Sequence, residues 1–266
     1  MKPVVYIGAE RVGAAVLEAL LKANKNIVAV FTAHPSLRHK IADYVDFSGL
    51  GKRFPKVVFH YILNNKEPSV IEKIKSYHPE AIFVISWSQL IPEVILEIPP
   101  KGVIGLHYSL LPKRRGGAPL NWAIIDGLNK SGITLYYMDR GIDSGDVIAQ
   151  KKFSIGYEDN VNGLLEKIKK IAPFLVLKYF DRIIKGDAPR LKQSARFSTY
   201  TRRRMPKDSQ ISWAWDLEKI YNFIRALTPP YPSAFSKLQN KKIIFTAVKK
   251  INNKRLKIEG YLEDHG

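Results

Sequence analysis

The stretch that decides the fold spans residues 3–31 and reads PVVYIGAERVGAAVLEALLKANKNIVAVF. Its first run, residues 3–8, is apolar and ends in glycine. Between Val12 and Ala23 the apolar residues recur every three or four positions, which is the spacing of one helix face. Residues 26–31 form a second apolar run. A strand, a helix and a strand within about 30 residues indicate the βαβ unit of a parallel sheet.

The same alternation continues along the chain. Strands are expected at residues 56–59, 81–85 and 102–106, with helices at 68–77 and 92–96 between them. These strand runs are apolar almost throughout, as expected when both faces of a sheet are covered. The sequence therefore predicts an α/β fold, a Rossmann-like and mostly parallel sheet with helices on both faces.

The pattern changes after Gln150. A long helix is expected at residues 160–184, a Gly-, Pro- and Arg-containing loop at 186–210 and a helix at 217–227. Short runs with strand character follow at residues 234–238, 242–248 and 255–262. We expect a first domain over 1–195, a linker over 196–210 and a small β-rich C-terminal domain over 211–266, whose completeness is left open.

Composition narrows the class of protein. The chain has 266 residues, 45% of them hydrophobic, which is enough for a globular core. It has no Cys, so disulfides, a cysteine nucleophile and a Cys-based zinc site are excluded. No apolar run is long enough to cross a membrane, and no secretory leader is evident, so a soluble cytoplasmic protein is expected.

The charge is strongly positive and unevenly distributed. The net charge is +19, and residues 1–150 hold 18 basic and 13 acidic residues, whereas residues 151–266 hold 25 and 11. The second part thus carries +14, which favours an anionic partner such as RNA, a nucleotide-linked substrate or acidic lipid. A solvated Lys-rich surface is the structural alternative.

A dinucleotide site is not expected. The turn after the first strand reads GAERVG at residues 8–13 and lacks the G-x-G-x-x-G spacing that lets a pyrophosphate approach the backbone. NAD and FAD are therefore excluded as cofactors, and Gly8 is interpreted as a turn glycine.

Chemistry is concentrated in residues 102–150. His107 ends a strand, and Asp143 and Asp146 lie in a loop after the strand predicted at 133–138. In open α/β sheets, ligands bind beyond the carboxyl ends of the strands, so these side chains can meet there. A His beside a carboxylate suits proton transfer near neutral pH, although a lone His at a strand end more often has a structural role.

A family resemblance rests on this region. The pieces HYSLLPKRRGGAP (107–119) and GIDSGD (141–146) resemble the formyltransferases that use 10-formyltetrahydrofolate, and NWAIIDG (121–127) and TRRRMPKDSQISW (201–213) support it. This family includes methionyl-tRNA formyltransferase and the sugar N-formyltransferases. The piece RGGAPLNWAIIDG, with the later PYPSAF, is most similar to the domain that formylates UDP-4-amino-4-deoxy-L-arabinose.

The resemblance implies a catalytic set of Asn, His and Asp. His107 and Asp143 match the last two, but Gly105 stands at the position of the family Asn, which donates a hydrogen bond to the formyl oxygen. Loss of such a donor typically costs ~10²–10³ in rate. A water, a backbone N–H or protonated His107 would have to replace it. The alternatives are a slower enzyme, altered chemistry or a protein that binds without turnover.

The resemblance also implies the ligands. N10-formyltetrahydrofolate is the expected co-substrate, and no metal is required. The segment FVISWSQLIP (83–92) resembles the family's pterin pocket, although simple packing would also explain Trp87 and Leu90. The expected folate contacts are Trp87, Ser88, Gln89, Leu90, Ile91, Asp139, Gly141, Ile142 and Asp146. The expected contacts to the acceptor are Ser109, Leu110, Leu111, Pro112, Arg115, Gly116, Arg202, Arg203 and Arg204.

Three functions compete. The motif match favours a nucleotide-linked amino sugar as acceptor, with Arg202–Arg204 clamping its diphosphate. The net charge of +14 over residues 151–266 favours tRNA as acceptor. Two features count against tRNA: residues 32–54 lack the basic Gly-rich insertion that resemblance to the tRNA enzyme would demand, and the C-terminal domain is short. Gly105 motivates a non-catalytic folate- or nucleotide-binding homologue. No membrane partner is expected, and a homodimer is left open.

Overall fold

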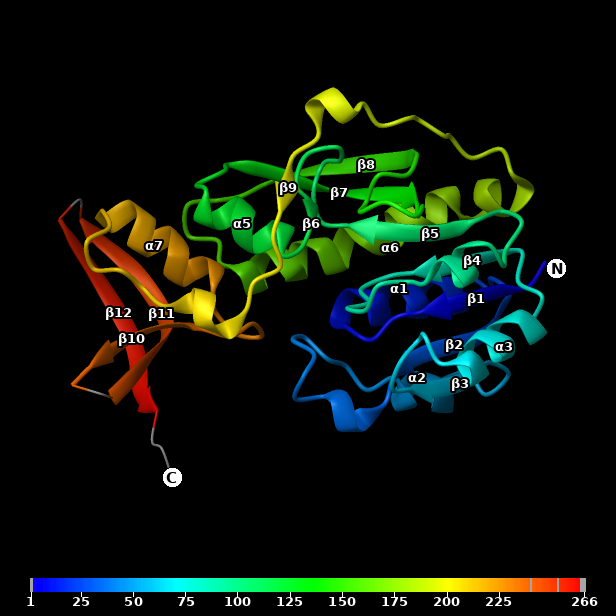
Figure 1. The fold of residues 1–266 in the computed structure, drawn as a ribbon, viewed down its shortest axis with the longest axis horizontal. Coiled ribbons are helices and arrows are strands. Elements are labelled where there is room, and N and C mark those ends of the chain that lie inside the picture. The colour runs from blue at the N-terminus through cyan, green and yellow to red at the C-terminus, as the bar shows by residue number, and fades with distance from the viewer. Residues whose placement is uncertain (1, 240, 253, 264–266) are drawn as a thin grey trace.

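The structure is a computed structural model that describes residues 2–239, 241–252 and 254–263. Its centre is a seven-stranded sheet in the order β3-β2-β1-β4-β5-β7-β8 (Figure 1). Strands β1 to β5 run parallel, and β7 and β8 are antiparallel to their neighbours. The strands are β1 (Val4–Ile7), β2 (Ile27–Ala33), β3 (Val58–Ile62), β4 (Ala81–Val84), β5 (Val103–His107), β7 (Lys130–Tyr137) and β8 (Val147–Ser154).

Both faces of the sheet are buried, which explains the continuous apolar runs. In β1, Val4 and Tyr6 belong to one core, which includes α1 (Arg11–Lys22) and α6 (Val161–Lys185). Val5 and Ile7 point to the opposite core, which contains α3 (Pro68–Ser76) and α4 (Glu93–Leu96). The short α2 (Ser48–Arg53) adds Leu50 to the first core. The Rossmann-like, mostly parallel fold is confirmed.

The expected elements differ from the structure mainly at the edges of the sheet. Strand β3 begins two residues later than predicted and ends at Ile62, and the sequence pattern does not predict β8. Most of β8 is partly or fully exposed and carries Lys151 and Lys152, so it lacks the apolar run of a central strand. An edge strand with one neighbour leaves a weaker pattern than a buried strand.

The C-terminal part is an antiparallel sheet with one helix. Strands β10 (Ala234–Leu238), β11 (Lys241–Asn252) and β12 (Arg255–Glu263) lie in that order. Helix α7 (Leu217–Ala226) packs against α5 (Pro119–Ile125), and the Asn121 side-chain amide donates to the backbone oxygen of Ala226 at 2.8 Å. The small β-rich domain is confirmed, and its core is continuous with one core of the large sheet. The domain bounds given above stay a prediction.

The segment between α6 and α7 lies across the large domain rather than apart from it. Figure 1 shows it passing over β8 and then beside β6 (Arg115–Gly116). Leu191 forms a bridge with Val147, and β9 (Tyr200–Thr201) pairs in parallel with β6. Three short 3₁₀ turns complete the described chain, η1 (Pro35–Leu37), η2 (Ala195–Phe197) and η3 (Pro206–Ser209). The segment therefore covers the loop that follows β5.

Candidate active site

The strand order opens a crevice at the centre of the sheet. Connections from β1 and β4 lead to opposite sides of the strand order, and a ligand crevice forms outside the carboxyl ends of strands at such a switch point. Residues 8–10, 85–87 and 107–109 follow β1, β4 and β5 at this edge. His107 is the last residue of β5, so the motif predicted from the sequence lies where ligands bind in this type of fold.

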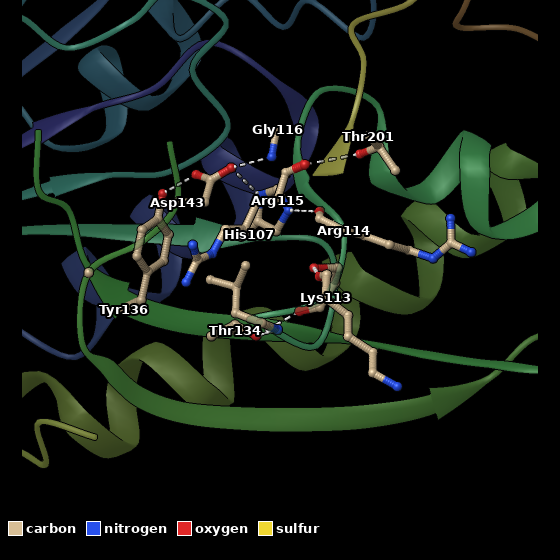
Figure 2. A network of polar contacts seen from close by, with 12 residues as sticks. His107, Lys113, Arg114, Arg115, Gly116, Thr134, Tyr136, Asp143 and Thr201 are labelled. Carbon is tan, nitrogen blue, oxygen red and sulfur yellow. Dashed lines mark hydrogen bonds and ion pairs between the residues drawn. The ribbon is translucent and has the colours of Figure 1, made fainter. Parts of the chain in front are cut away.

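His107 is fixed by the loop that follows it. Its side chain is 9% exposed, and its Nε2 lies 2.8 Å from the backbone oxygen of Arg114 (Figure 2). Because a carbonyl oxygen only accepts, Nε2 carries the proton in the neutral ring, and Nδ1 keeps its lone pair. Nδ1 faces Oδ2 of Asp143 at 3.4 Å. The geometry makes Nδ1 the basic atom and gives the imidazolium an anionic partner once Nδ1 is protonated.

Asp143 is held by two donors. Its backbone has a φ of 49°, in the left-handed region that Asp and Asn tolerate better than most residues. Oδ2 accepts the backbone N–H of Gly116 at 2.8 Å, and Oδ1 accepts the Tyr136 hydroxyl at 2.5 Å. Burial, and then the Asp143 charge, raise the pKa of Tyr136 well above its ordinary value, so this hydroxyl stays a donor. The carboxylate therefore has a fixed orientation toward His107.

Neighbouring side chains occupy the space into which a side chain at position 105 would extend. A Cβ built on it would lie 2.7 Å from Cε1 of Tyr136 and 3.0 Å from Cγ of Met138. Tyr136 is the cross-strand partner of Gly105, because β5 and β7 are antiparallel. Sequence reasoning missed Tyr136, since it did not predict the antiparallel pairing of β7. The only available signal was the alternation within the strand at 133–138.

The residues after β5 that are predicted to contact the acceptor form hydrogen bonds mainly with other residues of the chain. Oγ of Ser109 donates to the Lys113 oxygen at 2.7 Å, and the Leu111 N–H donates to Oγ1 of Thr134 at 3.1 Å. Leu110 is partly buried, and the Leu111–Pro112 peptide is cis. These contacts fix the loop that carries the Arg114 oxygen and the Gly116 N–H. Their role in binding an acceptor stays a prediction.

Gln193 is a second residue that sequence reasoning missed. Its Nε2 donates to the backbone oxygens of Asp143 and Gly145 at 2.9 and 2.7 Å. Its Oε1 accepts from Nη2 of the buried Arg115 at 2.8 Å, and Arg115 also donates to the Tyr200 hydroxyl at 3.1 Å. One amide thus ties the loops of both motifs together. Its position in the expected loop 186–210 gave no signal of this role.

The segment predicted to bind folate borders a cavity of about 450 Å³. Gln89 anchors the segment, because its Oε1 accepts from Asn65 N–H at 3.1 Å and its Nε2 donates to the Leu63 oxygen at 2.9 Å. Nε1 of Trp87 is buried and has no hydrogen-bond partner among the described residues, whereas the neighbouring Ile91 packs in the core beneath. The cavity is lined by Leu37, Lys40, Ile41, Leu63, Asn64, Lys66, Ser88, Gln89, Leu90 and Arg203.

The other predicted folate contacts form an exposed loop around Asp143. Oδ1 of Asp139 accepts from Gly141 N–H and from Oγ of Ser144, at 3.1 and 2.8 Å. Ile142 is 59% exposed, and Asp146 lies 3.9 Å from the guanidinium of Arg190. This loop is ordered by its own hydrogen bonds and presents an apolar side chain to solvent. Binding of folate here stays a prediction.

The three consecutive arginines have separate environments. Arg202 pairs with Asp208 at 2.7 Å, and Arg204 lies over the rings of Trp122 and Phe223 and donates to the Asp208 oxygen. Arg203 instead lines the cavity beside Ser88 to Leu90. Of these three arginines, therefore, Arg203 is the one that offers its charge to a ligand in that cavity.

A partly buried acidic residue, Glu10, lies just before α1. Burial, and then the charge of Asp43, raise the pKa of Glu10 to about 8. Burial, and then the Glu10 charge, raise the pKa of Tyr108 and Tyr231 as well. Arg11 next to Glu10 donates to Asp43 at 2.7 Å. Nothing in the sequence pattern singled out this group.

Metal ligands and membrane-spanning helices would point to other classes of protein. Within the part of the chain that the structure describes, no three acidic or His side chains are grouped as metal ligands. Over the same residues, no helix has both the length and the apolar character needed to cross a membrane.

Comparisons with known proteins identify the family. The family model described as formyl transferase matches residues 1–178, and that of its C-terminal domain matches residues 204–264. The chain is 34% identical over 256 residues to a methionyl-tRNA formyltransferase from Fusobacterium nucleatum, covering 94% of this chain and 80% of the relative. It is also 34% identical over 246 residues to the bifunctional polymyxin resistance protein ArnA of Wigglesworthia glossinidia brevipalpis, covering 92% of this chain but 37% of the relative.

Solved structures support the fold. A methionyl-tRNA formyltransferase from Clostridium thermocellum has a TM-score of 0.71 and 22% identity, with 99% of each chain covered. A 4-N formyltransferase from Francisella tularensis has a TM-score of 0.74 and 20% identity, covering 94% of this chain and 99% of that one. Together with the family models and the relatives of higher identity, these findings show that the chain belongs to the formyltransferase family and is an enzyme that transfers formyl groups.

Proposed function

We propose that this enzyme transfers the formyl group of N10-formyltetrahydrofolate to the amino group of methionyl-tRNA. The observation that carries the proposal is the similarity to a methionyl-tRNA formyltransferase over 94% of this chain, which includes the C-terminal part. The charge supports it, because residues 151–266 carry a net +14 and RNA affinity depends on Lys and Arg at phosphates.

The lysines of the C-terminal sheet suit a polyanion. Lys249 and Lys257 stand directly opposite each other on β11 and β12, and both are exposed. Like charges in this position are destabilising in the free protein, and an anion bound between them removes the repulsion. This surface supplies charge without a deep pocket, as backbone binding of a nucleic acid requires.

The site geometry supports a proton relay. The acceptor amine is neutral when its nitrogen attacks the formyl carbon, and it must lose a proton as the new C–N bond forms. Nδ1 of His107 takes that proton, and Asp143 at 3.4 Å pairs with the imidazolium. The proton then passes to N10 of the folate as the bond between N10 and the formyl carbon breaks. The products are the formylated amine and tetrahydrofolate, so atoms and charge balance.

Folate binding is proposed at the cavity beside β4. Ser88, Gln89 and Leu90 line that cavity, and all three belong to the segment that resembles the family's pterin pocket. Lys40, Lys66 and Arg203 on the cavity wall suit carboxylates. The cavity adjoins the segment after β4, and β4 is the neighbour of β5, whose last residue is His107.

A nucleotide-linked amino sugar is the second candidate acceptor. The sequence motifs favour this acceptor, and 92% of this chain matches ArnA with 34% identity. Arg203 at the cavity could pair with a diphosphate. The relatives named for methionyl-tRNA outweigh this, because one of them matches most of both chains.

One panel of assays decides between the acceptors. Purified enzyme and N10-formyltetrahydrofolate are incubated with methionyl-tRNA, with uncharged tRNA, or with UDP- and dTDP-linked amino sugars, and the formylated product is measured. We expect turnover with methionyl-tRNA and at least ~10²-fold lower kcat/KM with the sugars, since a sugar cannot supply the binding energy of the tRNA phosphates. A higher kcat/KM for an amino sugar would overturn the proposed acceptor.

The catalytic role of His107 is tested in the same panel. His107→Ala should abolish transfer to every acceptor, because the variant lacks the base at the end of β5. Tetrahydrofolate binding, measured by calorimetry, should remain close to that of the wild type. Wild-type turnover in this variant would remove His107 from the mechanism.

A further inference from the structure

We propose that the ring of Tyr136 fills the space that a side chain at position 105, where the family has Asn, would occupy. We also propose that Tyr136 acts as a positioning residue for Asp143. Its ring occupies the space beside Gly105. Its hydroxyl holds the carboxylate of Asp143, which faces His107 (Figure 2). This inference rests on the proposed roles of His107 and Asp143 in formyl transfer.

Gly105 and Tyr136 share one space in the sheet. They are opposite each other in the antiparallel pair of β5 and β7, so their side chains lie on the same face. His107 is two residues along β5 and shares that face. A Cβ at position 105 would lie 2.7 Å from Cε1 of Tyr136, which leaves no room for a larger side chain there. Glycine at 105 and tyrosine at 136 therefore depend on each other.

The Tyr136 hydroxyl fixes the orientation of Asp143. Tyr136 is 4% exposed, and its hydroxyl donates to Oδ1 of Asp143 at 2.5 Å. The Gly116 N–H holds the other oxygen, Oδ2, which faces His107. With one donor on each oxygen, the carboxylate cannot rotate away from the imidazole.

The surrounding charged groups do not replace the hydroxyl. Besides Asp143, the ionisable groups that face this pair are His107 on β5 and Asp139, which adds to the electrostatic environment of Tyr136. Asp139 bonds to Gly141 and Ser144, and Nε2 of His107 bonds to the Arg114 oxygen. Tyr136 is thus the one side-chain hydroxyl that donates to Asp143 among the described residues.

The matched variants are Tyr136→Phe and Tyr137→Phe. Each removes one hydroxyl and keeps the ring, but Tyr137 packs in the core on the opposite face and lies against Arg190. With any acceptor that the wild type formylates, Tyr136→Phe should lower kcat by roughly 10-fold or more, the worth of one hydrogen bond to a charged group, with little change in KM. Tyr137→Phe should keep the wild-type kcat.

The split between kcat and KM separates positioning from packing. Without the hydroxyl, Asp143 loses the donor on Oδ1 and can turn away from His107, so kcat should fall while the KM values for folate and acceptor stay close to those of the wild type. A merely structural role would lower the Tm without lowering kcat at a temperature where the variant is folded. An unchanged kcat in the folded variant would overturn the proposal, even where His107→Ala shows that the proposed mechanism holds.

The steric dependence between positions 105 and 136 can be tested without measuring turnover. Gly105→Asn should lower the Tm, because its Cβ meets the Tyr136 ring. In the double variant with Tyr136→Ala the same Asn has room, so Gly105→Asn should lower the Tm less, or raise it, on that background. Equal effects of Gly105→Asn on both backgrounds would contradict the dependence between the two positions.

Discussion

Asp143 shows how a single residue joins two loops and two strands. Its backbone adopts a φ of 49°, which turns the carboxylate back toward β5 and β7. There it meets the Gly116 N–H, the Tyr136 hydroxyl and the edge of His107. Because each oxygen has one donor, the carboxylate keeps a fixed orientation beside His107. This arrangement suits the role of general base that we propose for His107.

A prediction at this scale concerns Asp143→Asn. Asn tolerates the same positive φ, so the loop should keep its shape while the charge is lost. We expect kcat to fall on the order of 10²-fold, because the imidazolium loses its anionic partner.

The measurement is kcat with saturating folate and acceptor. The unfolding midpoint of the variant, measured in parallel, controls for a loss of structure. A kcat equal to that of the wild type would show that Asp143 only shapes its loop.

At the scale of elements, the protonation of a side chain between β1 and α1 affects the free energy of unfolding. Arg11 at the first turn of α1 donates to Asp43 and to Glu166 of α6, both at 2.7 Å. Glu10 beside it has a pKa raised to about 8, first by burial and then by the Asp43 charge. The folded chain therefore keeps a proton on Glu10 that the unfolded chain releases near 4.5, the ordinary value.

Glu10→Gln should reveal this coupling. In the wild type, Glu10 lowers the free energy of unfolding as the pH rises from about 4.5 to about 8, since the folded state binds more protons over that range. Gln cannot titrate, so the variant should lose less stability than the wild type between about pH 6 and about pH 9. Urea unfolding at both pH values measures the difference.

Glu18→Gln on the same helix is the control. Hydrogen bonds from Lys22 and Arg53 lower the pKa of Glu18, so its contribution is present above the ordinary value of 4.5 and constant from there upward. The control should therefore shift stability equally at both pH values. If Glu10→Gln kept the wild-type pH dependence, Glu10 would not be the group responsible.

At the scale of the whole molecule, the candidate site and the exposed lysines of the C-terminal sheet lie in different parts of the structure. The large sheet builds the site, whereas the C-terminal sheet adds exposed lysines at the far end of the molecule from α3 (Figure 1). The two parts share one hydrophobic core through α5 and α7, so the C-terminal lysines have a fixed position relative to the site.

Reversing charge on this sheet should weaken tRNA binding. For Lys249→Glu with Lys257→Glu we expect a higher Kd for methionyl-tRNA and a shallower dependence on salt, by ~0.9 in log–log slope for each phosphate that the sheet no longer neutralises. Stability should change little, because both residues are exposed and the ion pair that is lost, Lys257 with Glu259 at 3.3 Å, lies at the surface. Filter binding across a salt series measures both quantities.

A control with the same change in net charge is Lys73→Glu with Lys75→Glu on α3. It should leave the Kd and the salt slope closer to those of the wild type, because α3 lies at the other end of the molecule. Equal weakening by both pairs would indicate that net charge alone, and not the C-terminal sheet, determines the affinity.

The sequence by itself determined the βαβ pattern, the strand that ends at His107 and the loop that carries Asp143. These follow from local periodicity and from the rule that loops after parallel strands meet at one edge. Only the tertiary structure placed Tyr136 opposite Gly105, because the register of an antiparallel pair depends on which strands become neighbours. Only the tertiary structure also brought Gln193 to Gly145, 48 residues away, since a bond between loops leaves no periodic pattern in the sequence.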